Sequence, residues 1–190
     1  MQERRSWLRV LAVVLALAAA ACVLPSAEAR PSHEARLARL TALERGALTA
    51  RVVELRDEVW RWRRLMGRPL PSYAGSVAHS TSLGYAHWVL RLWARRAAAA
   101  RRQAQHPPHL SAWLCIHRGE GPWGDPNPPY YGGLQMDYEF QQTYGGLLLR
   151  RKGTADHWTP LEQMWVAERA FRSGRGFYPW PNTARYCGLI

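Results

Sequence analysis

Six apolar residues in the first half of the chain follow one another at alternating intervals of four and three. They are Leu48, Val52, Leu55, Val59, Trp62 and Met66. This spacing predicts the seam of a coiled coil or of a helical hairpin. No proline interrupts the chain from about Ser32 to Met66, and Gly67 and Pro69 follow directly. We therefore expect one long helix, which packs on itself or self-associates with a second copy.

A second helix is expected from about Tyr85 to Gln105, because Pro107 and Pro108 stop it. Its predicted apolar face consists of Tyr85, Trp88, Val89 and Leu92. Arginine crowds the remaining faces. We place a domain boundary here, between a helical region of residues 30–107 and a C-terminal domain of residues 108–190.

The positive charge of the chain lies in the helical region. Residues 30–107 contain 15 Arg against 5 acids, a balance of +10, whereas residues 108–190 contain 8 basic residues against 7 acids, a balance of +1. Such a basic region favours an anionic partner. For an exported protein we expect anionic wall polymers or the membrane surface, and no nucleic acid.

The first 29 residues are typical of an export signal. A basic start precedes the mostly apolar stretch Trp7–Leu24, and Ala27-Glu28-Ala29 is a small-x-small cleavage site. We expect cleavage after Ala29 and a protein secreted to the cell wall. Two alternatives stay open, an uncleaved N-terminal anchor and a lipidated Cys22, and either would retain the protein at the membrane.

Removal of the signal leaves two cysteines, Cys115 and Cys187. An even pair in an exported protein predicts a disulfide. The sequence has no phosphate loop, nucleotide fingerprint or zinc-ligand spacing, so we expect no cofactor and no metal.

The C-terminal domain is predicted to be mainly helical, α+β at most. Helices are expected at about 109–120, 138–144 and 160–172, with a long loop through Pro129 and a turn or short hairpin around Tyr131–Leu134. In the 160–172 helix we expect Glu162, Gln163 and Glu168 to interrupt the apolar face. The tail from Gly174 to Ile190 is expected to be irregular.

Glu120 is the candidate general acid, because it ends a predicted helix and is followed by Gly121, Pro122 and Trp123. A carboxyl in such a place can protonate a glycosidic oxygen. Aromatic rings stack on pyranose faces, and amides bind sugar hydroxyls. The predicted substrate-binding residues are Trp123, Tyr130, Tyr131 and Gln135.

Residues 110–188 resemble the resuscitation-promoting-factor group of transglycosylase-like domains, which are small relatives of lysozyme. The matching features are Trp113, Glu120, Trp123, the run Tyr130–Gln135, Glu162-Gln163, and Trp180-Pro181 with Cys187. The resemblance implies a lysozyme-like domain that cleaves the glycan strand of peptidoglycan.

The chain departs from that family pattern in two places. The family has cysteine directly before the acid, whereas Cys115 precedes Glu120 by five positions. The stretch between the acid and Trp123 is also two residues shorter, and another placement of the gap would put Arg118 at the acid position.

The sequence therefore predicts a secreted lytic transglycosylase or muramidase that acts on peptidoglycan. It does not distinguish transglycosylation from hydrolysis. The alternatives are a peptidoglycan-binding or signalling module without catalysis, and a structural envelope protein.

Overall fold

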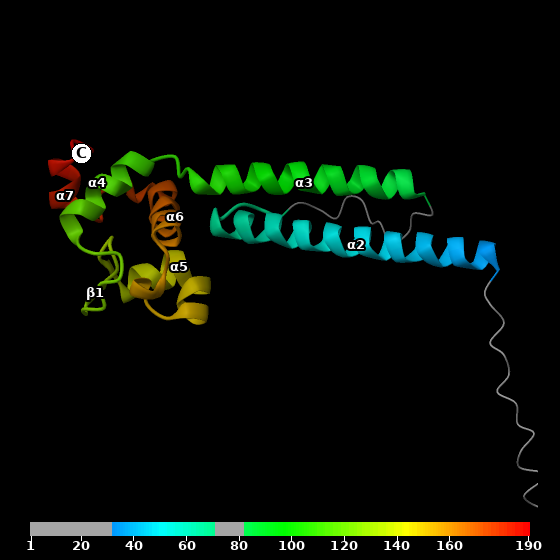
Figure 1. The fold of residues 1–190 in the computed structure, drawn as a ribbon. Helices are drawn as coiled ribbons and strands as arrows, with labels where there is room; N and C mark the ends of the chain where they lie inside the picture. The colour runs from blue at the N-terminus through cyan, green and yellow to red at the C-terminus, as the bar shows by residue number, and fades with distance from the viewer. Residues whose placement is uncertain (1–31, 71–81) are drawn as a thin grey trace, which may run out of the picture. The chain divides into compact units, whose positions relative to one another are not determined.

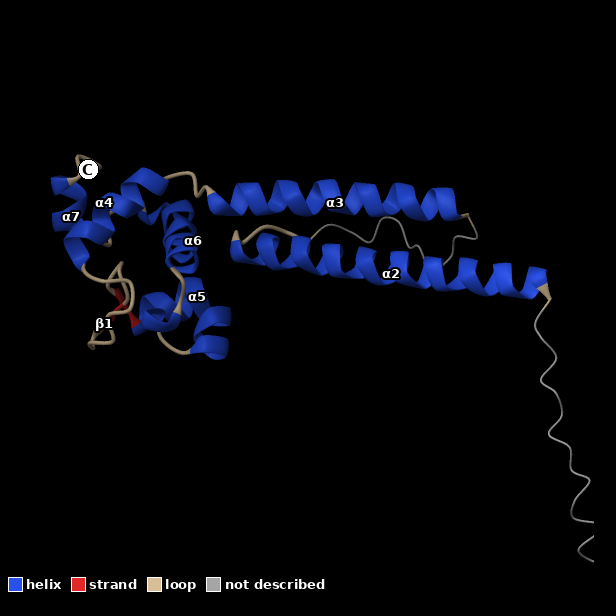
Figure 2. Ribbon diagram, viewed as in Figure 1, coloured by secondary structure: helices blue, strands red, loops and turns tan. Residues whose placement is uncertain are grey.

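The computed structural model describes residues 32–70 and 82–190, so the expected signal sequence lies outside the described residues. The chain is mainly α-helical (Figures 1 and 2). Its elements are α2 (His33–Leu65), α3 (Leu83–Gln105), α4 (Leu110–Glu120), β1 (Tyr130–Tyr131), β2 (Met136–Asp137), α5 (Tyr138–Lys152), η3 (Ala155–His157), α6 (Pro160–Ala170), η4 (Phe171–Arg175) and α7 (Pro181–Tyr186). No helix in these described ranges is long and apolar enough to span a bilayer. Contacts divide the chain into two units, residues 1–43 and 44–190.

The predicted seam packs against α3 of the same chain. The buried residues of this helix pair are Val52, Leu55 and Val59 of α2 and Ala86, Val89, Trp93, Ala97 and Ala100 of α3. The two helices are parallel (Figure 1). Toward their N-terminal ends, Glu44 Oε1 of α2 lies 3.4 Å from His87 Nε2 of α3. At their C-terminal ends, Met66 packs with Ala104. The expected packing of the long helix on its own chain is confirmed, but the arrangement is a parallel pair and no antiparallel hairpin.

The prediction of which residues form the buried apolar face of α3 was wrong in part. Tyr85 and Trp88 are 42% and 46% exposed and stack on each other, whereas Trp93 is buried. The rest of the buried face is mostly alanine, including Ala97. Small side chains let two helix backbones approach closely, so a face rich in alanine can be the buried one even when bulkier aromatic residues are available elsewhere.

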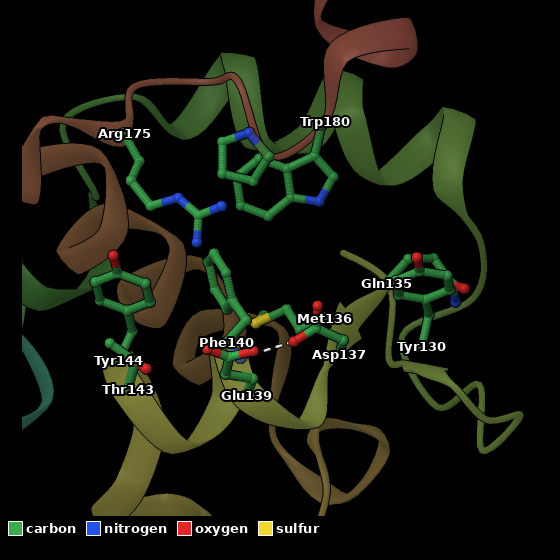
Figure 3. A pocket seen from close by; sticks show the side chains of 11 residues that line it. Tyr130, Gln135, Met136, Asp137, Glu139, Phe140, Thr143, Tyr144, Arg175 and Trp180 are labelled. Carbon is green, nitrogen blue, oxygen red and sulfur yellow. Dashed lines mark hydrogen bonds between the residues drawn. The ribbon is translucent and has the colours of Figure 1, made fainter.

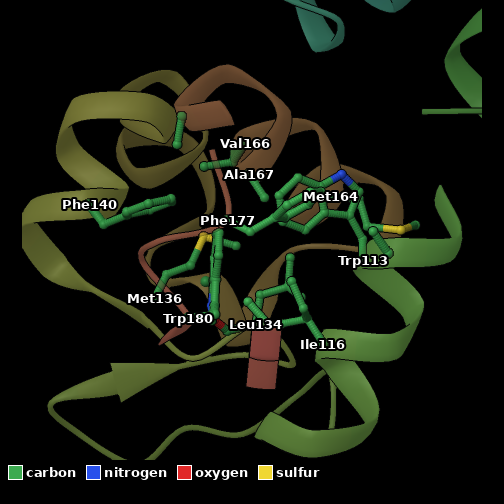
Figure 4. Packing of buried hydrophobic residues seen from close by; sticks show 14 of the residues in the cluster. Trp113, Ile116, Leu134, Met136, Phe140, Met164, Val166, Ala167, Phe177 and Trp180 are labelled. Carbon is green, nitrogen blue, oxygen red and sulfur yellow. The ribbon is translucent and has the colours of Figure 1, made fainter. Parts of the chain in front are cut away.

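A separate apolar core lies among α4, α5, α6, α7 and the segment before β2 (Figure 4). Its fully buried members include Trp113 and Ile116 of α4, Leu134, and Val166 of α6. Trp165 is also buried, but it faces the helix pair, where it packs with Met66 and Ala104.

Three buried polar side chains, Gln141, Gln163 and Glu168, belong to this core in the part of the chain that the structure describes. The Glu168 carboxylate accepts hydrogen bonds from Trp113 Nε1 (2.9 Å) and from the backbone N–H of His109 (2.9 Å). His109 Nδ1 lies 3.2 Å from the same oxygen. A buried carboxylate is tolerated only when such partners replace water. Glu168 therefore joins the start of α4 to α6, and it does not interrupt the core.

The C-terminal tail is more regular than predicted. It contains α7, whose Ala184 is fully buried in the core. The indole N–H of Trp180, at the start of α7, donates to Leu134 O (2.6 Å). The disulfide Cys115–Cys187 is present and joins the end of α7 to α4. A helix of this length is not stable alone, so these attachments explain why the tail is ordered.

Side chains of α6 and of η4, which follows it, bind the ends of the helix pair. Trp165 Nε1 donates to Ala104 O (2.7 Å), Arg169 to Leu65 O (2.7 Å) and Arg172 to Met66 O (2.8 Å). The carbonyls of Ala104 and Leu65 belong to the last turns of α3 and α2, where carbonyl groups have no partner within the helix, and Met66 directly follows α2. Burial, with a smaller contribution from the charge of Arg172, lowers the pKa of Arg169 to about 10.

The start of α6 is a capping box. Thr159 Oγ1 accepts the N–H of Glu162, and the Glu162 carboxylate accepts the N–H of Thr159 (2.8 Å) and binds Lys152 Nζ (2.7 Å) at the end of α5. Burial raises the pKa of Glu162, but hydrogen bonds from Lys152 and Thr159 outweigh it and the net pKa is lowered.

A pH titration of stability tests this arrangement. Because the pKa of Glu162 is lower in the folded state, its contribution is complete above its ordinary value of 4.5 and is lost as the pH falls through the folded value. We expect Glu162→Gln to lower the free energy of unfolding by about 1 kcal/mol at pH 7. The difference from wild type should shrink below about pH 4. Denaturant unfolding at several pH values measures it, and a difference that is constant with pH would contradict the assignment.

Candidate active site

Glu120 is the last residue of α4, as predicted, and its side chain is half-buried. The hydroxyl of Thr183, on α7, donates a hydrogen bond to Glu120 Oε1. The next residue, Gly121, caps the helix through its N–H to His117 O (3.2 Å). The carboxyl is therefore fixed at a helix end, between α4 and α7.

Gly121, the residue that follows Glu120, lies next to Gln135. A Cβ built on Gly121 would lie 3.4 Å from Gln135 Nε2 and 3.6 Å from Asp125 Oδ2. The Gln135 amide donates to Asp125 Oδ2 (2.9 Å) and to Gly132 O (3.0 Å). Gln135 also has a φ of 44°, a backbone conformation that residues other than glycine rarely adopt. Such conformations are kept where the surroundings impose them, often at functional sites.

The Gly132-Gly133 turn before Gln135 is held by a buried amide from α6. Gln163 Oε1 accepts the N–H of Gly133 (2.9 Å), and Gln163 Nε2 donates to Trp123 O (2.8 Å) and Ala155 O (2.8 Å). A Cβ at Gly132 would lie 2.6 Å from Gln163 Oε1, and its φ of 73° also favours glycine. One side chain thus fixes both segments that flank the candidate site.

The predicted aromatic residues differ in their exposure. Trp123 is half-buried; its ring stacks on His117 with centroids 3.9 Å apart and lies over Gly133. Tyr131 is half-buried and packs against the core. Tyr130, on β1, is 50% exposed. Tyr130 is thus the most accessible of the three, and packing accounts for much of the surface of Trp123.

A cavity of about 490 Å³ opens beside Gln135 (Figure 3). Its walls are formed by Tyr130, Gln135, Met136, Asp137, Glu139, Phe140, Thr143, Tyr144, Arg175, Pro179 and Trp180. The volume is in the range of small-molecule sites. Of the predicted site residues, Tyr130 and Gln135 line it. Glu120, Trp123 and Tyr131 do not line it, and Gly121, the residue after Glu120, lies close to the lining residue Gln135.

The cavity also contains charged groups that sequence reasoning missed. Glu139, in the first turn of α5, contributes a carboxylate, and Arg175 lies with its guanidinium 5.8 Å from the centre of the Phe140 ring (Figure 3). Arg175 stands between Gly174 and Gly176, both with positive φ. Two glycines that flank an arginine indicate an unusual turn. They do not indicate that this turn places the arginine in the cavity.

Two other carboxylates near the site have structural partners. Asp137 begins α5 and accepts the N–H of Phe140 (2.7 Å). Asp125 binds Gln135 and the N–H of Asn127. In the part of the chain that the structure describes, no three His, Cys, Asp or Glu side chains gather to hold a metal ion.

Comparison of the chain with protein-family models, with curated proteins and with solved structures gives no significant match. A functional interpretation therefore depends on the site geometry and on the motifs of the sequence.

Replacing Gln163 by leucine tests its part in building the site. The variant leaves the N–H of Gly133 and the carbonyl of Ala155 without their partner, and each unpaired buried group costs about 1–3 kcal/mol. We expect the free energy of unfolding to fall by at least about 3 kcal/mol. Gln142→Leu, at an exposed position of α5, is the matched control and should change it by less than about 0.5 kcal/mol. Equal effects of the two variants in denaturant unfolding would contradict this role.

Proposed function

We propose that the protein is an exported lytic enzyme of the cell wall that cleaves the glycan strand of peptidoglycan, and that its C-terminal domain is lysozyme-like. The observation that carries the proposal is the position of Glu120. Its carboxyl is fixed by Thr183 at the end of α4, and the next residue lies against Gln135 at the edge of the cavity. A fixed carboxyl whose neighbour in the chain lies against Gln135, together with a cavity that has aromatic and amide walls, supplies the groups that glycosidic cleavage needs.

In this mechanism Glu120 donates a proton to the glycosidic oxygen, and the C–O bond breaks with positive charge developing on the sugar ring. Tyr130 and Gln135 bind the sugars through stacking and hydrogen bonds, and Trp123 and Tyr131 support the segments that carry them. The cleaved end is then captured either by water, as in a muramidase, or by the sugar's own 6-hydroxyl, as in a lytic transglycosylase. In either case the proton that the attacking water or hydroxyl loses returns to the Glu120 carboxylate.

Two other functions remain as alternatives. A peptidoglycan-binding or signalling module would use the same cavity without needing a proton donor. A structural envelope protein would depend on the helix pair and not on the cavity. Mass spectrometry of products from purified peptidoglycan separates these functions, because anhydro-muramyl ends indicate a transglycosylase, reducing ends a hydrolase, and no products either alternative.

Replacing Glu120 by glutamine removes the transferable proton and keeps the size of the side chain. We expect the turnover of peptidoglycan to fall by at least about 100-fold, which is typical for the loss of a general acid. Glycan affinity and the melting temperature should change little.

Asp137→Asn is the control, because asparagine can still cap α5 and the charge change is the same. It should retain most of the activity. An active Glu120→Gln protein beside an inactive Asp137→Asn protein would move the acid to Asp137.

The basic helix pair is proposed to attach the enzyme to anionic wall polymers or to the membrane surface. Its exposed arginines include Arg51, Arg61, Arg64, Arg91, Arg95, Arg101 and Arg102. Exposed charges are screened within about 8 Å at physiological salt. We expect binding to isolated walls to weaken steeply between about 50 and 200 mM salt. Changing Arg91, Arg95 and Arg102 to glutamine should flatten this salt curve, and an unchanged curve would contradict attachment through α3.

A further inference from the structure

We propose that Thr183 is a positioning residue for the Glu120 carboxyl and that the Cys115–Cys187 disulfide holds Thr183 in place. This inference rests on the proposed role of Glu120 as the general acid. The disulfide would then contribute to activity as well as to stability, and loss of the disulfide would lower turnover.

The first observation is the hydrogen bond between α7 and α4. Thr183 Oγ1 donates to Glu120 Oε1, so the hydroxyl occupies one of the carboxyl oxygens. The other oxygen, Oε2, is left for a substrate, since no hydrogen bond or ion pair to it is found in the described part of the chain. A glutamate side chain rotates about three bonds, and one bound oxygen removes most of that freedom. Displacement of a reacting group by about 1 Å can cost about 100-fold in rate.

The second observation is the close approach of the two helices at the residue before the acid. A Cβ built on Gly119 would overlap the methyl group of Thr183, so any larger residue at 119 would push α7 away from Glu120. Glycine in the last turn of a helix is costly for helix stability. The contact with Thr183 supplies a physical reason for its presence here.

The third observation is the place of the disulfide. Cys115 stands four residues before Gly119 on α4, and Cys187 stands four residues after Thr183, at the C-terminal end of α7. Four residues are about one helical turn, so the disulfide lies on the same faces of both helices as the Gly119–Thr183 contact. It therefore closes α7 onto α4 one turn away from the Glu120 hydrogen bond. The short helix α7 has its other attachment through Trp180 and Ala184.

Three variants test the positioning role: Thr183→Val, Thr183→Ser and Glu120→Gln. Valine keeps the branched shape and removes the hydroxyl. With soluble glycan strands as substrate, we expect Thr183→Val to lower kcat by about 10-fold or more with KM nearly unchanged. Thr183→Ser should restore most of kcat, and the melting temperature of both should stay near that of wild type. Wild-type kcat in Thr183→Val, or a Thr183→Ser protein as slow as Thr183→Val, would overturn the inference.

Glu120→Gln separates failure of the inference from failure of the proposed function. If Glu120→Gln turns over glycan at the wild-type rate, Glu120 is not the acid, and the proposed function fails together with the inference. If Glu120→Gln is inactive and Thr183→Val is fully active, only the inference fails.

A double-variant comparison tests the role of the disulfide. The paired substitution Cys115→Ser with Cys187→Ser should lower kcat when it is measured at a temperature well below the melting temperature of this variant, where the protein is still folded. The same pair in the Thr183→Val background should lower kcat by less than about 2-fold, because contributions that act through one contact are not additive. If the protein with both serine substitutions does not fold, mild reduction of the disulfide in the folded wild-type and Thr183→Val proteins provides the same comparison. Equal losses in both backgrounds would overturn the coupling between the disulfide and Thr183.

Discussion

The candidate site depends on one buried amide, Gln163. Its carbonyl oxygen accepts the N–H of Gly133, and its NH₂ group donates to the carbonyls of Trp123, Ala155 and Trp158. No other side chain of this size supplies both an acceptor and donors. A glutamate would lose the donors, and a leucine would leave the backbone groups unpaired at a cost of about 1–3 kcal/mol each. The loop that carries Trp123 and the turn that carries Gln135 are therefore held by the same group.

Helix α6 serves the site on one face and the helix pair on another. Gln163 and Glu168 point into the C-terminal core, whereas Trp165 and Arg169 bind carbonyls at the ends of α3 and α2. The capping box at Thr159 fixes where this helix begins. A shift of α6 by one residue would rotate the side chains by about 100° and would break both sets of contacts.

Local patterns predicted much of the fold, and the structure follows them closely. The seam from Leu48 to Met66 predicted α2, a helix expected at about 160–172 corresponds to α6, and the cysteine pair predicted the disulfide. These signals lie within a few turns of chain, or in a pair of residues without competitors. The position of Glu120 at the end of α4 was predictable for the same reason, because the apolar stretch before it and Gly121 after it mark a helix end.

Features that depend on distant contacts were not predictable. Gln163 and Glu168 are polar residues on a helix that also carries apolar ones. The sequence does not show that the fold places hydrogen-bond partners for them in the core. The order of α7 depends on Trp180, Ala184 and the disulfide, none of which acts through local propensity. The walls of the cavity combine residues from β1, α5 and the turn around Arg175, which only the fold brings together.

The parallel arrangement of α2 and α3 has a consequence for self-association. The residues of the predicted seam, such as Val52, Leu55 and Val59, are already buried against α3 of the same chain. A second copy could not use them without separating the pair, and exposing that core would cost about 25 cal/mol for each Å² of apolar surface. Self-association of these helices, if it forms, must therefore use surface outside the seam. Where that surface carries exposed arginines, such as Arg61, Arg91 and Arg95, like charges between copies oppose each other unless an anionic partner lies between them.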